Sequence, residues 1–321
     1  MEQPFVSIVI PSFNSADTLG DAIQACKNQD YPSARTEIIV VDDGSTDGTE
    51  KVVSKFNIKY IKQKRSGPAS ARNNGFKNAK GDAICFTDAD CIPDPDWVSK
   101  LVNHYYAEDT RAVAGSYNVY GSPYLLDKFV HYEIRDRHSR MPEYVNSFGT
   151  YNVMIKRNAF EAAGGFNPEY CNASGEDTDL SYRIIKSGYK IYFAKNAFVS
   201  HKNILRLWKY FGVQFRHGCW RMKLYKAHCP MIAKDEYGYW KDFLEVFLAM
   251  GAVFCLFFNL EIASILAIAL FLIQLSLAVK IAVEGRNILY AGFSFVTFIR
   301  VFVRILGGVF GFIRFWIFRM G

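Results

Sequence analysis

The sequence predicts an α/β protein with a mostly parallel, doubly wound sheet, followed by a helical membrane region. Short apolar runs alternate with segments of helical period along the first part of the chain, which favours strands joined by helices. Acidic loops follow two of these runs. After Phe243 the chain is apolar to about residue 282, with only Glu245, Glu261 and Lys280 as charges, so a bilayer is its natural solvent. Half of the 321 residues are hydrophobic, which is high for a purely soluble enzyme.

The first strands are predicted by runs of β-branched residues that end in turn residues. They are expected at residues 5–10, 37–41, 58–61 and 83–87. The helices that join them are expected near residues 19–26, 49–56 and 67–79. Ligands of such sheets bind beyond the carboxyl ends of the strands. The acidic groups Asp42-Asp43 and Asp88-Ala89-Asp90, each at such an end, are therefore expected to meet at one cleft.

The next elements follow from capping signals and apolar period. Asp94-Pro95 is typical of a helix start, which predicts a helix toward Tyr106. Further helices are expected at residues 124–140, 157–163 and 177–186, where Gly164-Gly165 and Gly188 mark two of the ends. Further strands are expected at residues 112–119, 148–155 and 190–200, and the last one leads into His201.

The apolar region divides into candidate membrane segments. Residues 242–260 and 262–283 are expected to form a helical hairpin that turns at Asn259-Leu260-Glu261, and residues 288–318 are expected to lie in the interface rather than to span. This gives a cytosolic domain at residues 1–235 and a membrane-associated region at 236–321. The absence of a signal-type segment at the start of this sequence favours a large domain that lies on the cytoplasmic face.

Charge follows the same division. Residues 201–321 hold 15 lysines and arginines against 6 acids, and the first 200 hold 23 against 25. A basic excess beside membrane segments indicates anionic lipid or a lipid phosphate, and nucleic acid is not an expected partner because no recognition module is present. The seven cysteines show neither paired spacing nor a zinc pattern, so reduced thiols are expected.

Two acidic groups are candidates for chemistry, and each has an alternative interpretation. Asp88 and Asp90 could seat a hard divalent cation, Mn²⁺ or Mg²⁺, or only cap the next helix. Asp42 and Asp43 could hold a base or ribose, or only form an Asp/Gly/Ser turn. His201 could add a metal or diphosphate contact, although a lone histidine is more often packed.

A third acidic group begins the helix at residue 177. Ser174-Gly175-Glu176-Asp177 has the form of a capping box, so Asp177 could satisfy the helix end or serve as a general base. Asp179 and Arg183 could be an ordinary ion pair four residues apart. Other cations could bind phosphates or be solvated surface charges: Arg65, Arg72 and Arg216.

Taken in order, these motifs resemble the family 2 glycosyltransferases, inverting enzymes of the GT-A fold. The matching stretches are residues 6–14, 41–49, 67–75, 87–90, 164–166 and 175–183, within a resemblance over roughly residues 4–205. The resemblance implies Asp177 as the base and Asp88, Asp90 and His201 at the metal. It implies a donor-binding set of Pro11, Phe13, Asn14, Asp42, Asp43, Arg72, Asp88, Glu176, Arg183 and Arg216.

The resemblance also implies a reaction. A sugar would pass with inversion from a UDP-, GDP- or dTDP-sugar to an acceptor, and relatives with C-terminal membrane helices suggest a lipid-linked or envelope glycan acceptor. The stretch from Gln214 to Arg221 lacks the Gln-x-x-Arg-Trp spacing of processive synthases, which favours a non-processive enzyme. The alternatives are a non-catalytic nucleotide-sugar-binding partner of another membrane enzyme and, with little support, a transporter or channel.

Overall fold

The chain folds into two compact units in the computed structural model. The structure describes residues 3–107, 109–170, 174–202, 206–234 and 240–319. The sheet unit contains Met1–Tyr120 and Arg135–Asn203, and the helical unit contains Gly121–Ile134 and Ile204–Gly321. Helix α5 (Leu125–Ser139) contributes residues to both units.

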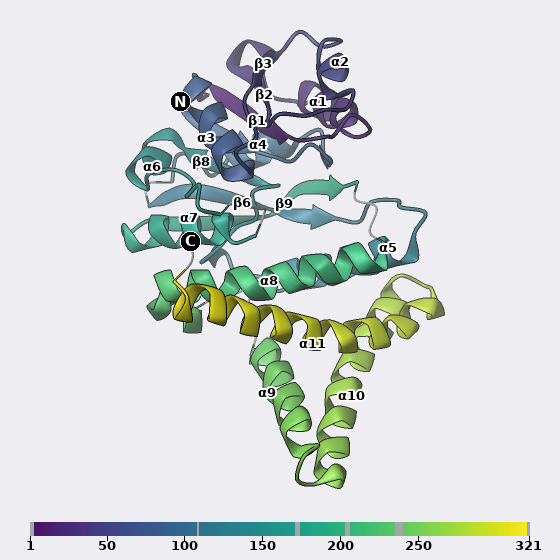
Figure 1. Cartoon of the computed structure of the whole chain (residues 1–321). Coiled ribbons are helices and arrows are strands. Elements are labelled where there is room, and N and C mark those ends of the chain that lie inside the picture. The colour runs from purple at the N-terminus through teal and green to yellow at the C-terminus, as the bar shows by residue number, and fades with distance from the viewer. Residues whose placement is uncertain (1–2, 108, 171–173, 203–205, 235–239, 320–321) are drawn as a thin grey trace. The chain divides into compact units, whose positions relative to one another are not determined.

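The sheet unit is built on one mixed sheet (Figure 1). The strands that the structure describes are β1 (Val6–Ser12), β2 (Thr36–Asp42), β3 (Lys59–Lys62), β4 (Ala83–Phe86), β5 (Cys91–Pro93), β6 (Thr110–Asn118), β7 (Tyr144–Val145), β8 (Val153–Lys156) and β9 (Lys190–His201). Their order is β3-β2-β1-β4-β8-β6-β9-β5, and β7 pairs with β9. The first four strands are parallel, whereas β8 is antiparallel to both β4 and β6. The predicted α/β class with a mostly parallel sheet and following helices is confirmed.

Helices cover the strands where the sequence predicts them, with shifted ends. They are α1 (Leu19–Lys27), α2 (Thr49–Val53), α3 (Pro68–Asn78), α4 (Trp97–Val102), α6 (Arg157–Ala162) and α7 (Glu176–Lys186). Helix α4 starts later than expected because the Trp97 amide bonds to the Asp94 carbonyl in a turn. Strand β8 starts five residues late because the Asn152 amide bonds back to Gly149.

The core of the sheet unit explains why its central strands read as continuous apolar runs. Ile8, Ile10 and Val40 are completely buried, as expected for parallel strands covered on both faces. Trp97 of α4 is also buried, and its indole N–H donates to Asn152 Oδ1 at 2.7 Å. This bond satisfies the polar atom of a large core side chain and ties α4 to the segment before β8.

The helical unit is held by two helices that pack closely along each other. Its elements are α8 (Leu207–Ala227), α9 (Trp240–Cys255), α10 (Leu260–Glu284) and α11 (Phe293–Phe312), with short helical turns at Cys229–Lys234, Ile288–Gly292 and Ile313–Ile317. Helices α8 and α11 lie side by side (Figure 1). A side chain at Gly218, Gly307 or Gly311 would collide with the backbone of the other helix. The compact helical unit thus starts at Ile204 in the later part of the chain and also takes in Gly121–Ile134.

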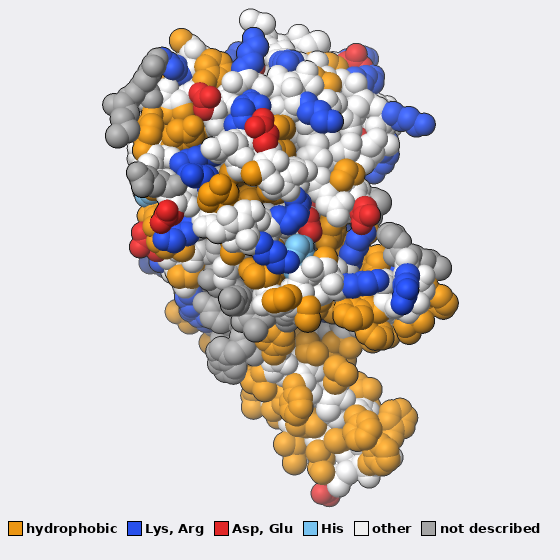
Figure 2. Space-filling model, turned by 90° about the vertical axis from the view of Figure 1, so that its left-hand side faces the viewer, with side chains coloured by type: hydrophobic (Ala, Val, Ile, Leu, Met, Phe, Trp, Pro, Cys, Tyr) orange, Lys and Arg blue, Asp and Glu red, His pale blue; other side chains and the backbone are white. Residues whose placement is uncertain are grey.

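Helices α9 and α10 form the expected hairpin with an earlier turn. Helix α9 ends at Cys255, and Asn259 caps α10 by accepting the Ile262 amide at 3.1 Å, so Leu260 and Glu261 already belong to α10. Hydrophobic side chains cover the hairpin in the lower part of Figure 2, and Phe257 and Phe258 near its tip are mostly exposed. By length and composition, two helices could cross a membrane, Leu260–Glu284 and Ile288–Ile317.

Candidate active site

The Asp42-Asp43 loop follows β2 and is held by its own carboxylates. Asp42 accepts the Ser45 amide at 2.8 Å and the Tyr60 hydroxyl at 2.6 Å. Asp43 accepts three donors at 2.8 Å, from Gln63 and from the backbone of Ser66 and Gly67 at the start of α3. Both side chains are buried. The structure therefore gives both acids a role in shaping the loop, and contact with a base stays a prediction that would use remaining lone pairs.

The loop after β1 lies against the same turn. Asn14 has a positive φ of 47°, and its amide donates to the Ser45 hydroxyl at 2.8 Å while its Oδ1 accepts the Thr46 amide at 2.9 Å. Pro11 is part of β1, and the exposed ring of Phe13 carries the Arg65 guanidinium 3.3 Å from its centroid. The predicted donor-binding residues Pro11, Phe13 and Asn14 are thus brought to the Asp42 loop.

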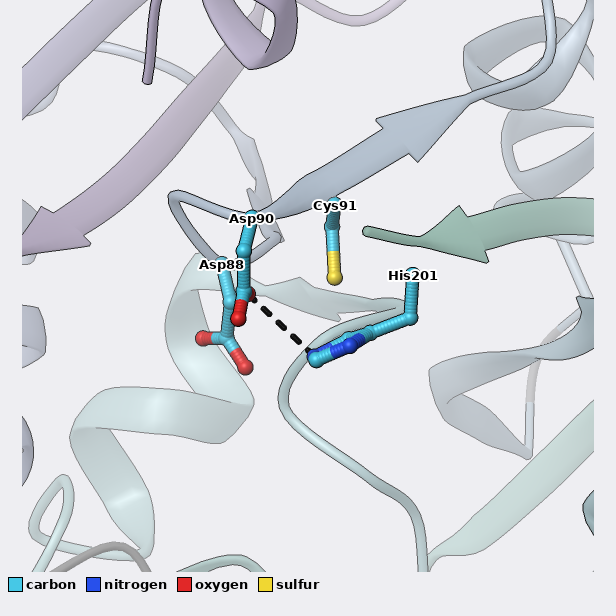
Figure 3. Close-up of side chains that lie close together, drawn as sticks. All are labelled: Asp88, Asp90, Cys91 and His201. Atoms are coloured by element: carbon cyan, nitrogen blue, oxygen red, sulfur yellow. Dashed lines mark ion pairs between the residues drawn. The ribbon is translucent and has the colours of Figure 1, made fainter. Parts of the chain in front are cut away.

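A second group of donor atoms lies where β4 ends and β5 begins. An oxygen of Asp88, an oxygen of Asp90, the sulfur of Cys91 and a ring nitrogen of His201 lie within 4.8 Å of one another (Figure 3). His201 Nε2 is 3.2 Å from Asp90 Oδ1. The predicted metal ligands Asp88, Asp90 and His201 therefore converge, although more than one hundred residues of chain separate His201 from the two acids.

Sequence reasoning missed Cys91 at this site. Strand β5 is only three residues long and ends at Pro93, so it gives no alternating pattern to predict it. In the structure β5 is antiparallel to β9, with Cys91 directly opposite His201. Burial raises the pKa of the Cys91 thiol to about 11, although nearby His201 opposes this shift.

Arg72 joins this group to the start of α7. The arginine is almost completely buried on α3, and its two terminal nitrogens donate to Asp88 Oδ1 at 2.8 Å and to Glu176 Oε1 at 3.0 Å. Its Nε has no hydrogen-bond partner among the described residues. Two carboxylates that are distant in sequence are thus fixed by one rigid fork, which a lysine could not reproduce. The structure gives Arg72 protein carboxylates as partners, and phosphate contact stays a prediction.

The start of α7 differs from the expected capping box. The residue before the helix is Gly175, which has a φ of 95° and no side-chain cap. The Ser174 amide donates to Glu176 Oε2 at 2.8 Å, so Glu176 and not Asp177 accepts that donor. A box through Asp177 is therefore wrong, because the left-handed Gly175 shifts the helix start by one residue.

Asp177 is half-buried beside this ion pair. Its Oδ1 accepts the Thr178 amide at 2.8 Å. Burial and the neighbouring carboxylate of Glu176 raise the pKa of Asp177 to about 7, against the lowering effect of that amide and of Arg72. A carboxyl group with such a pKa can accept a proton near neutral pH and release it again, as a general base requires.

Two predicted donor-binding arginines lie in other surroundings. Arg183 forms the expected ion pair with Asp179, at 2.6 Å, and also donates to the carbonyls of Ala163 and Gly165. These bonds attach the turn at Gly164-Gly165 to α7. Arg216 is exposed on α8 in the helical unit, and its assignment to the donor stays a prediction.

The donor set fits the expected cation. Carboxylate oxygens with one imidazole are suitable ligands for Mn²⁺, and Mg²⁺ accepts the same oxygens. Asp88 keeps one oxygen beyond its bond to Arg72, and Asp90 and His201 already face each other. Asp88, Asp90 and His201 are therefore the residues that would hold a bound metal.

The mostly parallel sheet carries acidic loops at the carboxyl ends of β2 and β4, where α/β sheets bind their ligands. The family described as glycosyl transferase family 2 matches residues 7–163, and the N-terminal domain of galactosyltransferase matches residues 131–206. This chain therefore contains a family 2 glycosyltransferase domain with the GT-A fold, and the family match covers just under half of its length.

Individual relatives support the same family. Glycosyltransferase AglE of Haloferax volcanii is 28% identical over 62% of this chain and 67% of its own length. Probable glycosyltransferase YdaM of Bacillus subtilis is 33% identical over 60% of this chain and 49% of its own length, so this chain spans only about half of that relative.

A solved structure shares the fold. The mannosyltransferase PcManGT from Pyrobaculum calidifontis, in complex with GDP-Man and Mn²⁺, has a TM-score of 0.65 and 18% identity. The match covers 96% of this chain and 88% of that one, so it includes the C-terminal helices.

Proposed function

We propose that this protein is an inverting, metal-dependent, non-processive glycosyltransferase that moves a sugar from a nucleotide-diphosphate sugar to a lipid-linked or cell-envelope glycan acceptor. The observation that carries the proposal is the Arg72 bridge. It fixes the Asp88 carboxylate and the Glu176-Asp177 helix start around one guanidinium, so metal ligands and base belong to one polar network. A nucleotide-sugar donor is also what the solved structure named above binds.

In this mechanism Asp177 is the base. Its carboxylate removes the proton of the acceptor hydroxyl, the hydroxyl oxygen attacks the anomeric carbon, and the bond from that carbon to the diphosphate breaks. Attack from the side opposite the leaving group inverts the anomeric carbon. A bound Mn²⁺ or Mg²⁺ supplies the positive charge that stabilises the departing diphosphate. Arg72 keeps Asp88 and Glu176 at fixed positions throughout.

The nucleoside end of the donor belongs at the loops after β1 and β2. Carboxylates there accept hydrogen bonds from base N–H groups and ribose hydroxyls but repel phosphates. The loop of Asp42 and Asp43, with Phe13 and Asn14 beside it, suits the nucleoside for this reason. Which nucleotide binds, UDP, GDP or dTDP, depends on donors and acceptors that these loops present to the base edge.

The helical unit suits a membrane surface with the sheet unit on the cytoplasmic side. Helix α11 packs along α8 through glycines, and α8 carries the cations Lys209, Arg216, Arg221, Lys223 and Lys226. A spanning α11 would carry these charges toward hydrocarbon at high cost. An interfacial α11, with the hairpin of α9 and α10 inserted, leaves the cations at lipid headgroups, where a lipid-phosphate acceptor also lies.

The test is a transfer assay with the full chain in detergent or lipid. We expect donor hydrolysis or transfer with one of a panel of UDP-, GDP- and dTDP-sugars in the presence of Mn²⁺ or Mg²⁺, and loss of activity with a chelator. The Asp177→Asn variant should lose about 10³-fold or more in kcat, because the base is removed, while its donor affinity changes less than about threefold.

The matched control is Asp179→Asn, two residues further along α7. Asp179 pairs with Arg183 and has no role in the proposed proton transfer. The folded fraction of the Asp179→Asn variant should therefore keep most of the transfer activity. Full turnover by Asp177→Asn would contradict the base assignment. Tight nucleotide binding with no turnover across donors and acceptors would instead indicate a non-catalytic binding partner of another membrane enzyme.

A further inference from the structure

Cys91 is the one member of the Figure 3 group to which the proposed reaction gives no role. Its sulfur lies within 4.8 Å of the donor atoms of Asp88, Asp90 and His201. Figure 3 shows the side chain projecting from β5 toward the space between Asp90 and His201. Because Cys91 is directly opposite His201 in the antiparallel pair of β5 and β9, both side chains leave the sheet on the same face.

A sulfur atom changes which cations such a group accepts. Mg²⁺ and Mn²⁺ select oxygen, whereas Zn²⁺ and Cd²⁺ are held well by thiolate and imidazole. In a tetrahedral zinc site with bonds of about 2.0–2.3 Å, neighbouring donor atoms lie roughly 3.3–3.8 Å apart. The 3.2 Å between His201 Nε2 and Asp90 Oδ1 is close to that spacing. No two of the four donor atoms are more than 4.8 Å apart, so side-chain movements of about 1 Å bring them to that spacing.

We propose that Asp88, Asp90, Cys91 and His201 form a closed site for a thiophilic divalent cation of the zinc type, and that Cys91 decides between this cation and Mn²⁺ or Mg²⁺. The inference rests on the proposed function, which uses the same acids with open coordination positions. Binding forms a sulfur–metal bond and breaks the S–H bond, whose proton goes to water. Four protein ligands leave no position for the donor diphosphate, so the zinc-type cation inhibits transfer.

The test measures metal binding directly. The purified full chain is freed of metal and titrated with Cd²⁺ and with Co²⁺, whose bonds to sulfur give charge-transfer absorption. We expect this absorption to saturate at one equivalent in the parent chain and to be absent in Cys91→Ser. In the same variant, Zn²⁺ affinity should fall at least about tenfold while Mn²⁺ affinity changes less than about threefold.

Two control variants test whether a thiol other than Cys91 causes the absorption. Cys85→Ser places a hydroxyl at an equally buried position on β4, and Cys229→Ser removes an exposed thiol. Both should keep the absorption. A Cys91→Ser chain that retains the full absorption, or that binds Zn²⁺ as tightly as the parent chain, overturns the proposal.

A second measurement is available if Cys91→Ser does not fold. X-ray absorption of the Zn²⁺-loaded Cys229→Ser chain should show a sulfur neighbour at about 2.3 Å, and a shell of only oxygen and nitrogen would overturn the proposal. None of these readouts uses sugar transfer. Failure of transfer with every donor would therefore contradict the proposed function alone, and loss of the sulfur signal would contradict this inference alone.

Discussion

Each unit of the molecule buries an arginine against a carboxylate, but the two pairs differ in what they leave accessible. Arg72 binds Asp88 and Glu176 with separate nitrogens, and the Asp88 side chain stays 28% exposed. Arg300 of α11 places Nη1 2.7 Å from both oxygens of Glu133, which is only 13% exposed, and 3.1 Å from the Tyr210 hydroxyl. The same kind of ion pair therefore holds carboxylates of the proposed active site in the sheet unit and fastens helices in the helical unit.

Among the changes that test the contrast between the two arginines, Arg72→Met is expected to have the largest effect. Its removal leaves Asp88 and Glu176 without their shared cation, so we expect transfer to fall by about 10²–10³-fold. The free energy of unfolding should fall by about 3–5 kcal/mol, because a buried carboxylate loses its partner. Initial rates and chemical unfolding of the full chain measure the two quantities.

A double variant sharpens this prediction. In Arg72→Met with Glu176→Gln the buried charge of Glu176 is gone and only the partly exposed Asp88 lacks its arginine, so part of the stability should return while activity stays low. Recovery of activity together with stability would show that Arg72 acts only as a structural ion pair, and the contrast between the two arginines would be lost.

Arg300→Met is expected to affect stability alone. The unpaired Glu133 should lower the free energy of unfolding by about 3–5 kcal/mol. Donor binding by the folded fraction should change by less than about threefold, since all the proposed donor and metal ligands except Arg216 belong to the sheet unit. Calorimetry measures the loss of stability, and donor titration measures the donor affinity. A loss of donor affinity without a loss of stability would contradict the assignment of a purely structural role to Arg300.

A smaller effect in the helical unit is expected at neighbouring glycines. A side chain at Gly307 would collide with the Phe215 backbone, so Gly307→Ala should lower stability by about 1–3 kcal/mol. Gly308 is the matched control, because the nearest atom to an added Cβ is 4.0 Å away. Gly308→Ala should be neutral or stabilising by up to about 1 kcal/mol. If both changes lowered the free energy of unfolding equally, the close contact between α8 and α11 would not be at Gly307.

The smallest effect is a pH dependence that belongs to the sheet unit. Because the pKa of Asp177 is raised to about 7, kcat/KM should rise with pH up to about 7 and fall about tenfold per unit below it. The free energy of unfolding depends on pH in the opposite direction. Protonated Asp177 favours the folded state, so its contribution is complete below the usual aspartate value of about 4 and is lost as pH rises through 7. A kcat/KM profile without a limb near 7 would argue against Asp177.

The apolar pattern of the sequence predicted the elements whose positions depend on neighbouring residues in the chain. The apolar runs before Asp42 and Asp88 are buried parallel strands, and the helical spacing of Leu19, Ile23 and Cys26 located α1. Elements without such a pattern were missed, because β5 and β7 are three and two residues long and exist through pairing with β9. The hairpin turn was misplaced because apolar residues on both sides of it give no period that marks an end.

For the candidate site, the sequence predicted the closeness of three side chains but not the contacts that connect them to the rest of the site. Asp88, Asp90 and His201 were expected together and lie together. The Arg72 bridge and the position of Cys91 depend on segments distant in sequence, so no local spacing could reveal them. The capping box failed at Gly175 because its left-handed conformation depends on the surrounding turn.

The short pairing of β5 with β9 restricts how many residues can connect β4 to β5, as well as which residues they are. Only three residue pairs set this register, and moving it by one place would turn Cys91 to the opposite face from His201. The Lys202 amide donates to the Asp90 carbonyl at 2.7 Å, and this bond fixes the turn that directly precedes β5. A single inserted or deleted residue between Phe86 and Cys91 would therefore do more damage than most substitutions there.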